Sequence, residues 1–140
     1  MSQISIVIPA AGASRRMGDR DKLLELVDGV PLLRSVAERA LTVSNTVVVT
    51  LPVEAMARAE TLVDLPVLQV PVPDAADGMS ASLRRAAQAV PKTCDGMMIL
   101  PADMPDLTTD DLRQIVSAFD DASGEFLVQA TSTAGHPGHP

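Results

Sequence analysis

The chain has 140 residues, of which 46% are apolar and 21% are charged, a composition typical of a folded domain with a buried core. Its net charge of −7 excludes binding to nucleic-acid backbones by bulk attraction, because that binding needs an excess of Lys and Arg. Two Phe are the only aromatic residues, so few faces exist on which single-stranded bases could stack, and we expect no nucleic-acid partner.

Strand and helix patterns alternate along the chain. Residues 5–8 are a β-branched run that is apolar on both faces, as expected for a buried parallel strand. The pair Asp28-Gly29 suits a tight turn and predicts a small hairpin over residues 23–30. Apolar residues at helical spacing follow Pro31 and predict a helix to Leu41. The remaining predicted elements are a strand over 46–50, a helix over 53–62, a strand over 67–70, a helix over 80–90, a strand over 96–100, a helix over 108–119 and a strand over 125–130.

This alternation predicts the fold class. It is typical of a mostly parallel sheet with helices on both faces, so we expect a three-layer, Rossmann-like α/β protein with a single domain over residues 1–140. Thr108 and Asp111 have the spacing of a capping box, which marks the start of the last helix. Ligands of such sheets bind outside the carboxyl ends of the strands. Three loops with unusual chemistry leave strand ends here, over residues 10–22, 77–85 and 101–106.

The number of cysteines and the hydropathy of the chain indicate the cellular compartment in which the protein is expected. Cys94 is the only cysteine, so an internal disulfide cannot form and an oxidising compartment is not implied. The first residues lack the basic stretch and long apolar run of a signal peptide. No apolar run reaches the roughly 18 residues that a membrane-spanning helix needs. We therefore expect a cytoplasmic protein with no membrane partner.

The first of the three loops is the most informative segment. From Pro9 to Gly18 it reads Pro-Ala-Ala-Gly-Ala-Ser-Arg-Arg-Met-Gly, and Asp21-Lys22 follows. Small residues let the backbone approach a ligand closely, and exposed backbone N–H groups can cradle phosphates. Basic residues outnumber acidic ones in this segment of an acidic chain, which favours an anionic ligand. The spacing matches neither a Walker loop nor Gly-x-Gly-x-x-Gly, so the loop alone is also compatible with a solvated turn.

The other two loops carry polar side chains. Asp103 directly follows a predicted buried strand, where a ligand would bind, although Asp is also a common turn former. One carboxylate is enough for Mg²⁺ when substrate phosphates supply further oxygens. Gly78 permits close approach of a ligand. Ser80 and Ser82 can hydrogen-bond a pyrimidine edge, and Ser80 can alternatively be the N-cap of the next helix.

Residues 10–18, together with Lys22, resemble the signature of the MobA-like nucleotidyltransferases. Within that group the chain most resembles the molybdenum-cofactor (molybdopterin) cytidylyltransferases, through Asp21-Lys22-Leu23-Leu24 and Gly29-Val30-Pro31-Leu32-Leu33. The resemblance implies a nucleotide-diphospho-sugar-transferase-like fold. It also implies an Mg²⁺-dependent enzyme that transfers a cytidylyl group from CTP to a phosphate-bearing acceptor, molybdopterin, and releases pyrophosphate. Its implied partners are CTP or another NTP, a molybdopterin-type acceptor, and a molybdoenzyme or its chaperone.

The resemblance also assigns roles to individual residues. Arg16, Lys22 and Asp103 are the catalytic residues that it implies, with Asp103 as the metal ligand. Cations fixed around the phosphates stabilise the charge that develops in the transition state. Gly138-His139-Pro140 resembles a family motif near the substrate, which makes His139 a substrate-site residue. The implied nucleotide-binding residues are Ala10, Ala11, Gly12, Ala13, Ser14, Arg15, Lys22, Gly78, Met79, Ser80 and Ser82.

Several related functions are alternatives. GTP:molybdopterin guanylyltransferases usually have Gly-Gly where this chain has Ala11-Gly12. CTP:methylerythritol-phosphate cytidylyltransferases usually have Pro-Lys in place of Asp21-Lys22, although Pro9-Ala10-Ala11-Gly12 resembles their loop. A non-catalytic nucleotide-binding regulatory module is the alternative from another class. Members of the family continue well past the Gly-His-Pro motif, with further sheet elements and a second metal-binding carboxylate, so we expect this chain to be C-terminally truncated.

Overall fold

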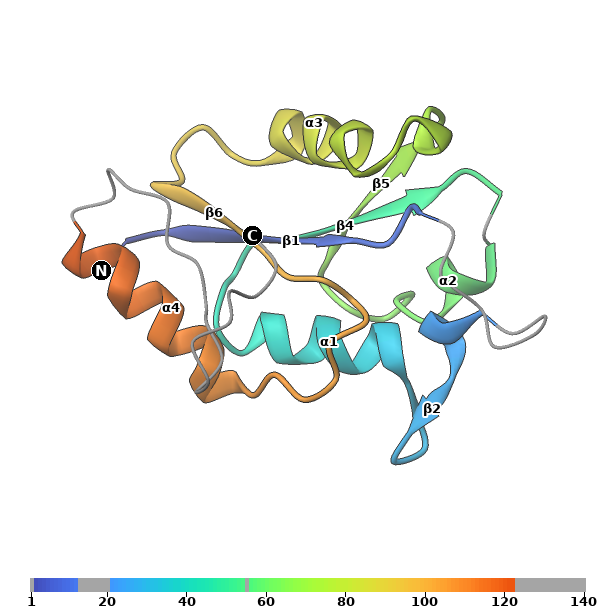
Figure 1. The fold of residues 1–140 in the computed structure, drawn as a ribbon, viewed down its shortest axis with the longest axis horizontal. Helices are drawn as coiled ribbons and strands as arrows, with labels where there is room; N and C mark the ends of the chain where they lie inside the picture. Colours follow the sequence, from blue (N-terminus) through green and yellow to red (C-terminus); the bar gives the residue numbers. More distant parts are fainter. Residues whose placement is uncertain (1, 13–20, 55, 123–140) are drawn as a thin grey trace.

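A computed structural model describes residues 2–12, 21–54 and 56–122, and it shows a sheet between two layers of helices (Figure 1). Within these residues the sheet has four strands, all parallel, in the order β5-β4-β1-β6. The fold class predicted from the sequence is therefore confirmed. The strands are β1 (Ile4–Pro9), β4 (Val47–Pro52), β5 (Leu68–Val72) and β6 (Gly96–Ile99); helix α3 (Met79–Ala89) covers one face, and α1 (Leu32–Leu41) and α4 (Thr109–Asp121) cover the other.

The two central strands are buried on both faces, which explains their continuous apolar runs. Ile6 and Ile8 of β1 belong to the larger core, between the sheet and helices α1 and α4. Val7, between them in sequence, and Val48 of β4 pack with Ala86 of α3 in a separate core on the opposite face. Successive side chains of a strand point to opposite faces, so one run of β-branched residues supplies both cores.

The predicted hairpin is present, but it is shorter than expected. Strands β2 (Leu26–Val27) and β3 (Val30–Pro31) are antiparallel. Asp28 and Gly29 between them both have positive φ, of 54° and 81°, as a type I′ turn requires. Before β2 the chain forms a 3₁₀ helix, η1 (Lys22–Leu24), where we expected strand. Its cause is local, because the Asp21 carboxylate accepts a hydrogen bond from the Leu23 amide at 3.1 Å.

Two other predicted elements differ in length. Helix α2 (Met56–Glu60) is about half as long as expected from residues 53–62. After Glu60 the α-helical pattern gives way to a tighter turn, because the amides of Thr61 and Leu62 donate to the carbonyls of Arg58 and Ala59, three residues back, at 3.2 and 3.1 Å. The Thr61 hydroxyl also donates to the carbonyl of Arg58 at 2.7 Å. Strand β5 runs through Pro71, where we expected it to stop, and in the described sheet this is an edge strand, where a residue without an N–H is tolerated. The strand predicted over 125–130 lies outside the described residues.

The start of α4 follows the capping-box prediction. The Thr108 hydroxyl accepts a hydrogen bond from the Asp111 amide at 3.1 Å, and the Asp111 carboxylate accepts one from the Thr108 amide at 2.8 Å. These hydrogen bonds hold the pKa of Asp111 below its usual range, the backbone amide of Thr108 contributing most. The reciprocal cap satisfies two amides that the first helical turn would otherwise leave without partners.

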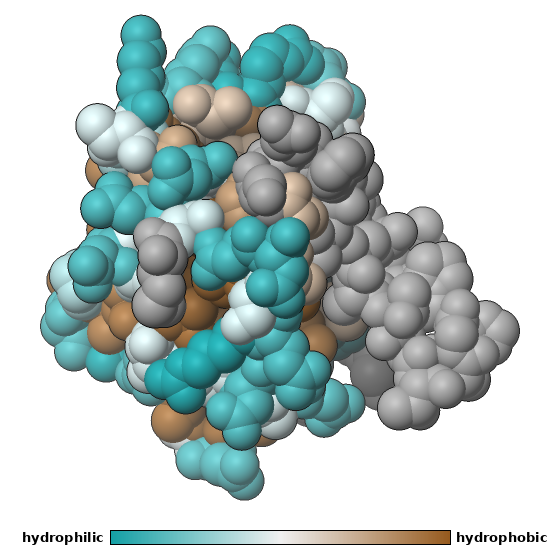
Figure 2. All heavy atoms as spheres, turned by 90° about the vertical axis from the view of Figure 1, so that its left-hand side faces the viewer, coloured by the Kyte–Doolittle hydropathy of each residue, from teal (hydrophilic) through white to brown (hydrophobic). Residues whose placement is uncertain are grey.

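The end of the molecule at which the strands begin is largely polar. Figure 2 faces this end, where hydrophilic side chains surround smaller groups of apolar ones. Cys94 is half-buried at this end, and its Sγ lies 2.7 Å from the Oγ of the fully buried Ser5. Among the described residues, no helix combines the length and apolar character needed to cross a membrane.

Replacing Thr108 with Ala should lower the free energy of unfolding by about 1 kcal/mol, because the Asp111 amide loses its acceptor. Urea denaturation followed by circular dichroism measures this change. Ser117, exposed in the same helix, provides the control, and Ser117→Ala should change stability by less than about 0.5 kcal/mol. Equal stability of wild type and Thr108→Ala would contradict the capping role.

Candidate functional site

The three loops singled out in the sequence meet at one cavity. It has a volume of about 400 Å³ and lies at the carboxyl ends of β1 and β6, beside the start of α3. The parallel sheet brings the loops together, because strands that run in one direction release their loops at the same edge. The cavity is lined by Pro9, Ala10, Gly12, Leu23, Ala75, Ala76, Gly78, Met79, Ser82, Pro101, Ala102 and Asp103.

Six of the predicted site residues therefore lie together, namely Ala10, Gly12, Gly78, Met79, Ser82 and Asp103. Three others have described positions but are not in the cavity lining: Ala11 is buried beside it, Lys22 is exposed on η1 next to the cavity-lining Leu23, and Ser80 is exposed on the first turn of α3. The predictions for Ala13, Ser14, Arg15, Arg16 and His139 fall outside the described residues. The roles of all these residues stay predictions.

The first loop begins with small residues that pack closely against neighbouring strands and helix α3. The Ala10 amide donates to the carbonyl of the fully buried Thr50 at 2.9 Å, which continues the alignment of β1 with β4. The Ala11 side chain is buried among Val72 and Ala81, so a larger residue would not fit there without rearrangement. At Gly12, by contrast, no atom lies within 4 Å of the position that a Cβ would take. Packing in the described structure thus explains Ala11 but leaves open space at Gly12.

The second loop consists of a short 3₁₀ helix, η2 (Ala75–Asp77), followed by Gly78. Gly78 has φ 100° and ψ −172°, a conformation that essentially only glycine adopts. Gly78 is also the residue that precedes the first turn of α3, so the alternative in which Ser80 is the N-cap is wrong. Ser82, one turn further along, is 3% exposed and lines the cavity.

The third loop places a single carboxylate at the cavity. The Leu100 amide donates to the carbonyl of Val7 at 2.8 Å, so the chain follows the sheet edge to its end before turning. Asp103 lies exposed in that turn, and Arg39 of α1 donates to the carbonyl of Pro105 at 3.3 Å. The described residues contain no group of three or more His, Cys, Asp or Glu that could enclose a metal ion. A single carboxylate such as that of Asp103 can still bind Mg²⁺ when phosphate oxygens of a substrate and water molecules supply the other ligands.

Sequence reasoning missed a further residue, Arg58 of α2, which contacts the first loop. It is 3% exposed, and its Nη1 donates to the carbonyls of Ala10 at 2.7 Å and Gly12 at 2.9 Å. Its Nε and Nη2 donate to the two carboxylate oxygens of Asp21 at 2.6 and 3.2 Å. In the sequence, Arg58 is seen only as one arginine within a short, Ala-rich helix pattern that follows a predicted buried strand. That signal does not identify the partner, which lies 37 positions earlier in the chain.

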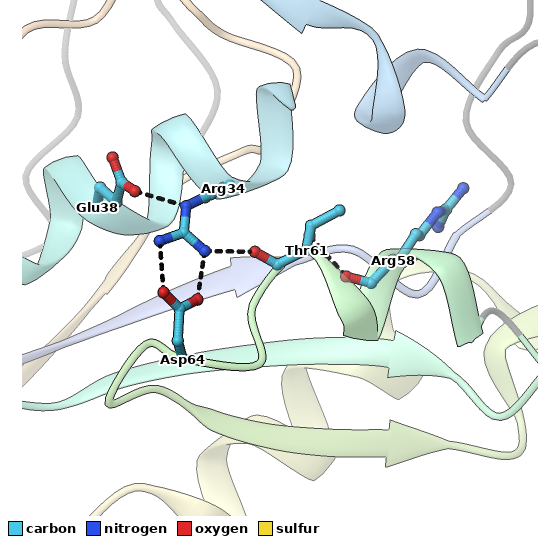
Figure 3. Close-up of polar contacts among 5 residues, drawn as sticks. All are labelled: Arg34, Glu38, Arg58, Thr61 and Asp64. Atoms are coloured by element: carbon cyan, nitrogen blue, oxygen red, sulfur yellow. Dashed lines mark hydrogen bonds and ion pairs between the residues drawn. The ribbon is translucent and has the colours of Figure 1, made fainter. Parts of the chain in front are cut away.

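The segment that carries Arg58 is itself tied to α1. Figure 3 shows the Arg34 guanidinium of α1 between Glu38, the carbonyl of Thr61 and the carboxylate of Asp64, while the Arg58 guanidinium points away from this cluster. The hydrogen bond from Arg34 is the main reason that the pKa of Asp64 lies below its usual range. The Thr61 hydroxyl in turn binds the Arg58 carbonyl. The backbone of α2 is thus held independently of its contact with the first loop.

Comparison with known proteins now defines the family. The chain matches the family model of the MobA-like NTP transferase domain over residues 6–140, and it therefore belongs to the MobA-like NTP transferase family. A search of curated proteins finds no match. The structure of a nucleotidyl transferase from Methanothermobacter (Mth528) superposes with a TM-score of 0.72 at 28% identity, covering 82% of this chain and 57% of that one. For Rv0371c from Mycobacterium tuberculosis the TM-score is 0.71 at 27% identity, with 83% of this chain and 59% of that one covered.

The chain thus spans less than two thirds of the length of these relatives. Two more distant structures, both below 25% identity, share the fold. One is CMP:2-keto-3-deoxy-manno-octonic acid synthetase complexed with CTP, with a TM-score of 0.70 at 23% identity over 87% of this chain and 49% of that one. The other is a manganese complex of Rv0371c, with a TM-score of 0.68 at 22% identity over 87% of this chain and 61% of that one.

The glycines of the first two loops should respond differently to substitution by Ala. Gly78→Ala should lower the free energy of unfolding by about 1–3 kcal/mol, because a Cβ is strained at its φ of 100°. Gly12→Ala should change stability by less than about 0.5 kcal/mol, since its Cβ would enter open space without a positive φ. Urea denaturation of both variants tests the contrast. A Gly12→Ala variant as unstable as Gly78→Ala would show that the fold, and not a ligand, requires Gly12.

Proposed function

We propose that this chain is the nucleotide-binding part of an enzyme that transfers a cytidylyl group from CTP to a phosphate-bearing acceptor, with molybdopterin as the acceptor. The observation that carries the proposal is the convergence of three loops on one cavity at the strand ends of a MobA-like NTP transferase domain. One loop supplies a backbone of small residues, one supplies Gly78 and Ser82, and one supplies the carboxylate of Asp103.

The lining of the cavity supports a nucleotide as the ligand. Its volume of about 400 Å³ lies within the range of pockets that hold small molecules. At Ala10 and Gly12 the backbone can approach phosphates, because no long side chain intervenes. At the start of α3, Met79 offers apolar surface and Ser82 a hydroxyl, a combination suited to a pyrimidine base. The CTP complex of the synthetase with the same fold agrees with this choice of donor.

Asp103 is the residue that would hold a divalent cation. Its carboxylate lies at the cavity wall, next to the space we assign to the phosphates. A bound Mg²⁺ would neutralise negative charge on the phosphate oxygens, and the manganese complex of Rv0371c supports a divalent ion in the family. Because the loop sequence resembles that of Mg²⁺-dependent enzymes, we assign Mg²⁺ as that ion.

The transfer itself needs little acid–base chemistry. An oxygen of the acceptor phosphate forms a bond to the α-phosphorus of CTP as the bond to the bridging oxygen breaks, and pyrophosphate leaves with that electron pair. Both the nucleophile and the leaving group are already anionic, so the residues mainly position them and stabilise charge. We assign charge stabilisation to Lys22 and Arg16, and we assign contacts with the triphosphate to the loop from Ala10 to Arg15.

Calorimetry with CTP, GTP, ATP and UTP, each with and without Mg²⁺, tests the donor. The titrations use the 140-residue chain and the longest gene product that contains it. Mg²⁺-dependent binding with preference for CTP is the expected result. Preference for GTP would replace the cytidylyltransferase with the guanylyltransferase alternative. Failure of both proteins to bind any nucleotide would overturn the proposal.

Lys22→Ala should lower the rate of nucleotidyl transfer by about tenfold to a hundredfold, because a fixed cation near the developing charge is lost. Release of pyrophosphate by the longest gene product measures the rate. Lys92→Ala is the matched control, since this lysine is exposed and precedes β6, at the end of the sheet away from the cavity. Wild-type turnover of the Lys22→Ala variant would remove Lys22 from the catalytic residues.

Asp103→Asn should weaken the Mg²⁺ dependence of nucleotide binding, because an amide oxygen binds a hard cation less well than a carboxylate. Titration of Mg²⁺ at a fixed CTP concentration measures the effect, and the midpoint should rise by about tenfold or more. Asp106→Asn, an exposed carboxylate of the same loop, provides the control and should keep the wild-type midpoint. An unchanged midpoint for Asp103→Asn would exclude Asp103 as the metal ligand.

A further inference from the structure

We propose that Arg58 is a positioning residue that holds the two ends of the nucleotide-binding loop at fixed places. The inference deepens the proposed function and rests on it for the identity of the ligand. It starts from a buried guanidinium whose three nitrogens all donate hydrogen bonds but which is not among the described residues that line the cavity. Arg58 joins the chain before the segment 13–20, at Ala10 and Gly12, to the chain after it, at Asp21.

At the first end of the loop, Arg58 orients the backbone. Its Nη1 binds the carbonyls of Ala10 and Gly12, which must therefore both face α2. The described peptide bonds are trans, and in a trans peptide the C=O and the following N–H point in opposite directions. The amide of Ala11 consequently points away from Arg58. By holding two carbonyls, Arg58 fixes the orientation of the peptide groups on either side of Ala11, at the start of the loop.

At the second end, Arg58 fixes the start of the turn that carries Lys22. The Asp21 carboxylate receives the two parallel hydrogen bonds from Arg58 and also accepts from the Leu23 amide, which caps η1. A planar guanidinium makes such a paired contact, whereas a lysine ammonium cannot reproduce it. The direction of the Lys22 backbone is thus tied to the same side chain that orients Ala10 and Gly12.

The burial of Arg58 within α2 supports its role in positioning the loop. Among the five residues of this helix, Arg58 is the only one that is buried. Removing a guanidinium from water is costly unless its nitrogens find hydrogen-bond acceptors, and here a carboxylate and two carbonyls supply acceptors for all three nitrogens. Arg34 holds the carbonyl of Thr61, the residue that follows α2, and the Thr61 hydroxyl binds the carbonyl of Arg58, so the end of α2 from which the guanidinium projects is itself tied to α1.

The test compares Arg58→Met, Arg58→Lys, Asp21→Asn and the double variant Arg58→Met/Asp21→Asn with the wild type. Leu112→Ala, a truncation of a fully buried residue of α4 outside the three loops, is the control for loss of stability alone. Two readouts are taken on the longest gene product, at a temperature where each variant is folded. Amide hydrogen exchange follows residues 10–12 and 21–24 without any ligand, and calorimetry gives the Kd of Mg²⁺-bound CTP.

We expect exchange at both ends of the loop to rise by at least about tenfold in Arg58→Met, because one side chain holds both ends. The Kd should rise by about tenfold to a hundredfold, since misplaced phosphate-binding groups lose most of their interaction. Arg58→Lys should be intermediate in both readouts. The double variant should be no worse than Arg58→Met, because the two side chains act as one unit. Leu112→Ala should keep the wild-type Kd.

Three results would overturn the inference: wild-type exchange in Arg58→Met, faster exchange at one end only, or a Kd change no larger than that of Leu112→Ala. If Arg58→Met does not fold, the decision passes to Arg58→Lys and Asp21→Asn, for which wild-type exchange and Kd would have the same meaning. Failure of the proposed function is separate, because the wild type itself would then bind no nucleotide. In that case faster exchange at both ends would still establish that Arg58 holds residues 10–12 and 21–24 in place.

Discussion

The burial of β1 on both faces is the constraint on which the rest of the structure depends. Ile6 and Ile8 form part of one core and Val7 part of the other, so this strand must lie in the interior of the sheet with a parallel neighbour on each side. Parallel neighbours release their loops at one edge. The cavity at the ends of β1 and β6 is thus a direct result of how the core is assembled.

Among the described residues, the candidate site is made of backbone and small side chains more than of charged groups. Ala10, Gly12 and Gly78 contribute surfaces where the main chain itself is accessible, and Asp103 is the one carboxylate among the lining residues that the structure describes. Such a site suits a ligand that carries its own charge and can bring its own cation. In such a site the position of the bound ligand depends on where the backbone lies. The hydrogen bonds of Arg58 to two backbone carbonyls are therefore important for ligand binding.

Local signals in the sequence predicted the structure well, and distant contacts were not visible there. Asp28-Gly29 and the pair Thr108 and Asp111 act within a few residues, and the hairpin turn and the helix start are where they were predicted. The extent of β5 depends on its place at the edge of the described sheet, which the sequence around Pro71 does not contain. Arg58 and Asp21 are brought together only by folding, so the tie between them could not be read in advance.

The walls of the cavity belong to different layers of the protein. Gly78, Met79 and Ser82 belong to the start of α3 on one face of the sheet, whereas the turn that holds Asp103 is hydrogen-bonded to α1 on the other face through Arg39. A molecule that touches both walls therefore links the two layers across the end of the sheet. Its binding energy adds to the free energy of unfolding of the whole domain, so the occupied protein resists heat and proteases more than the empty one.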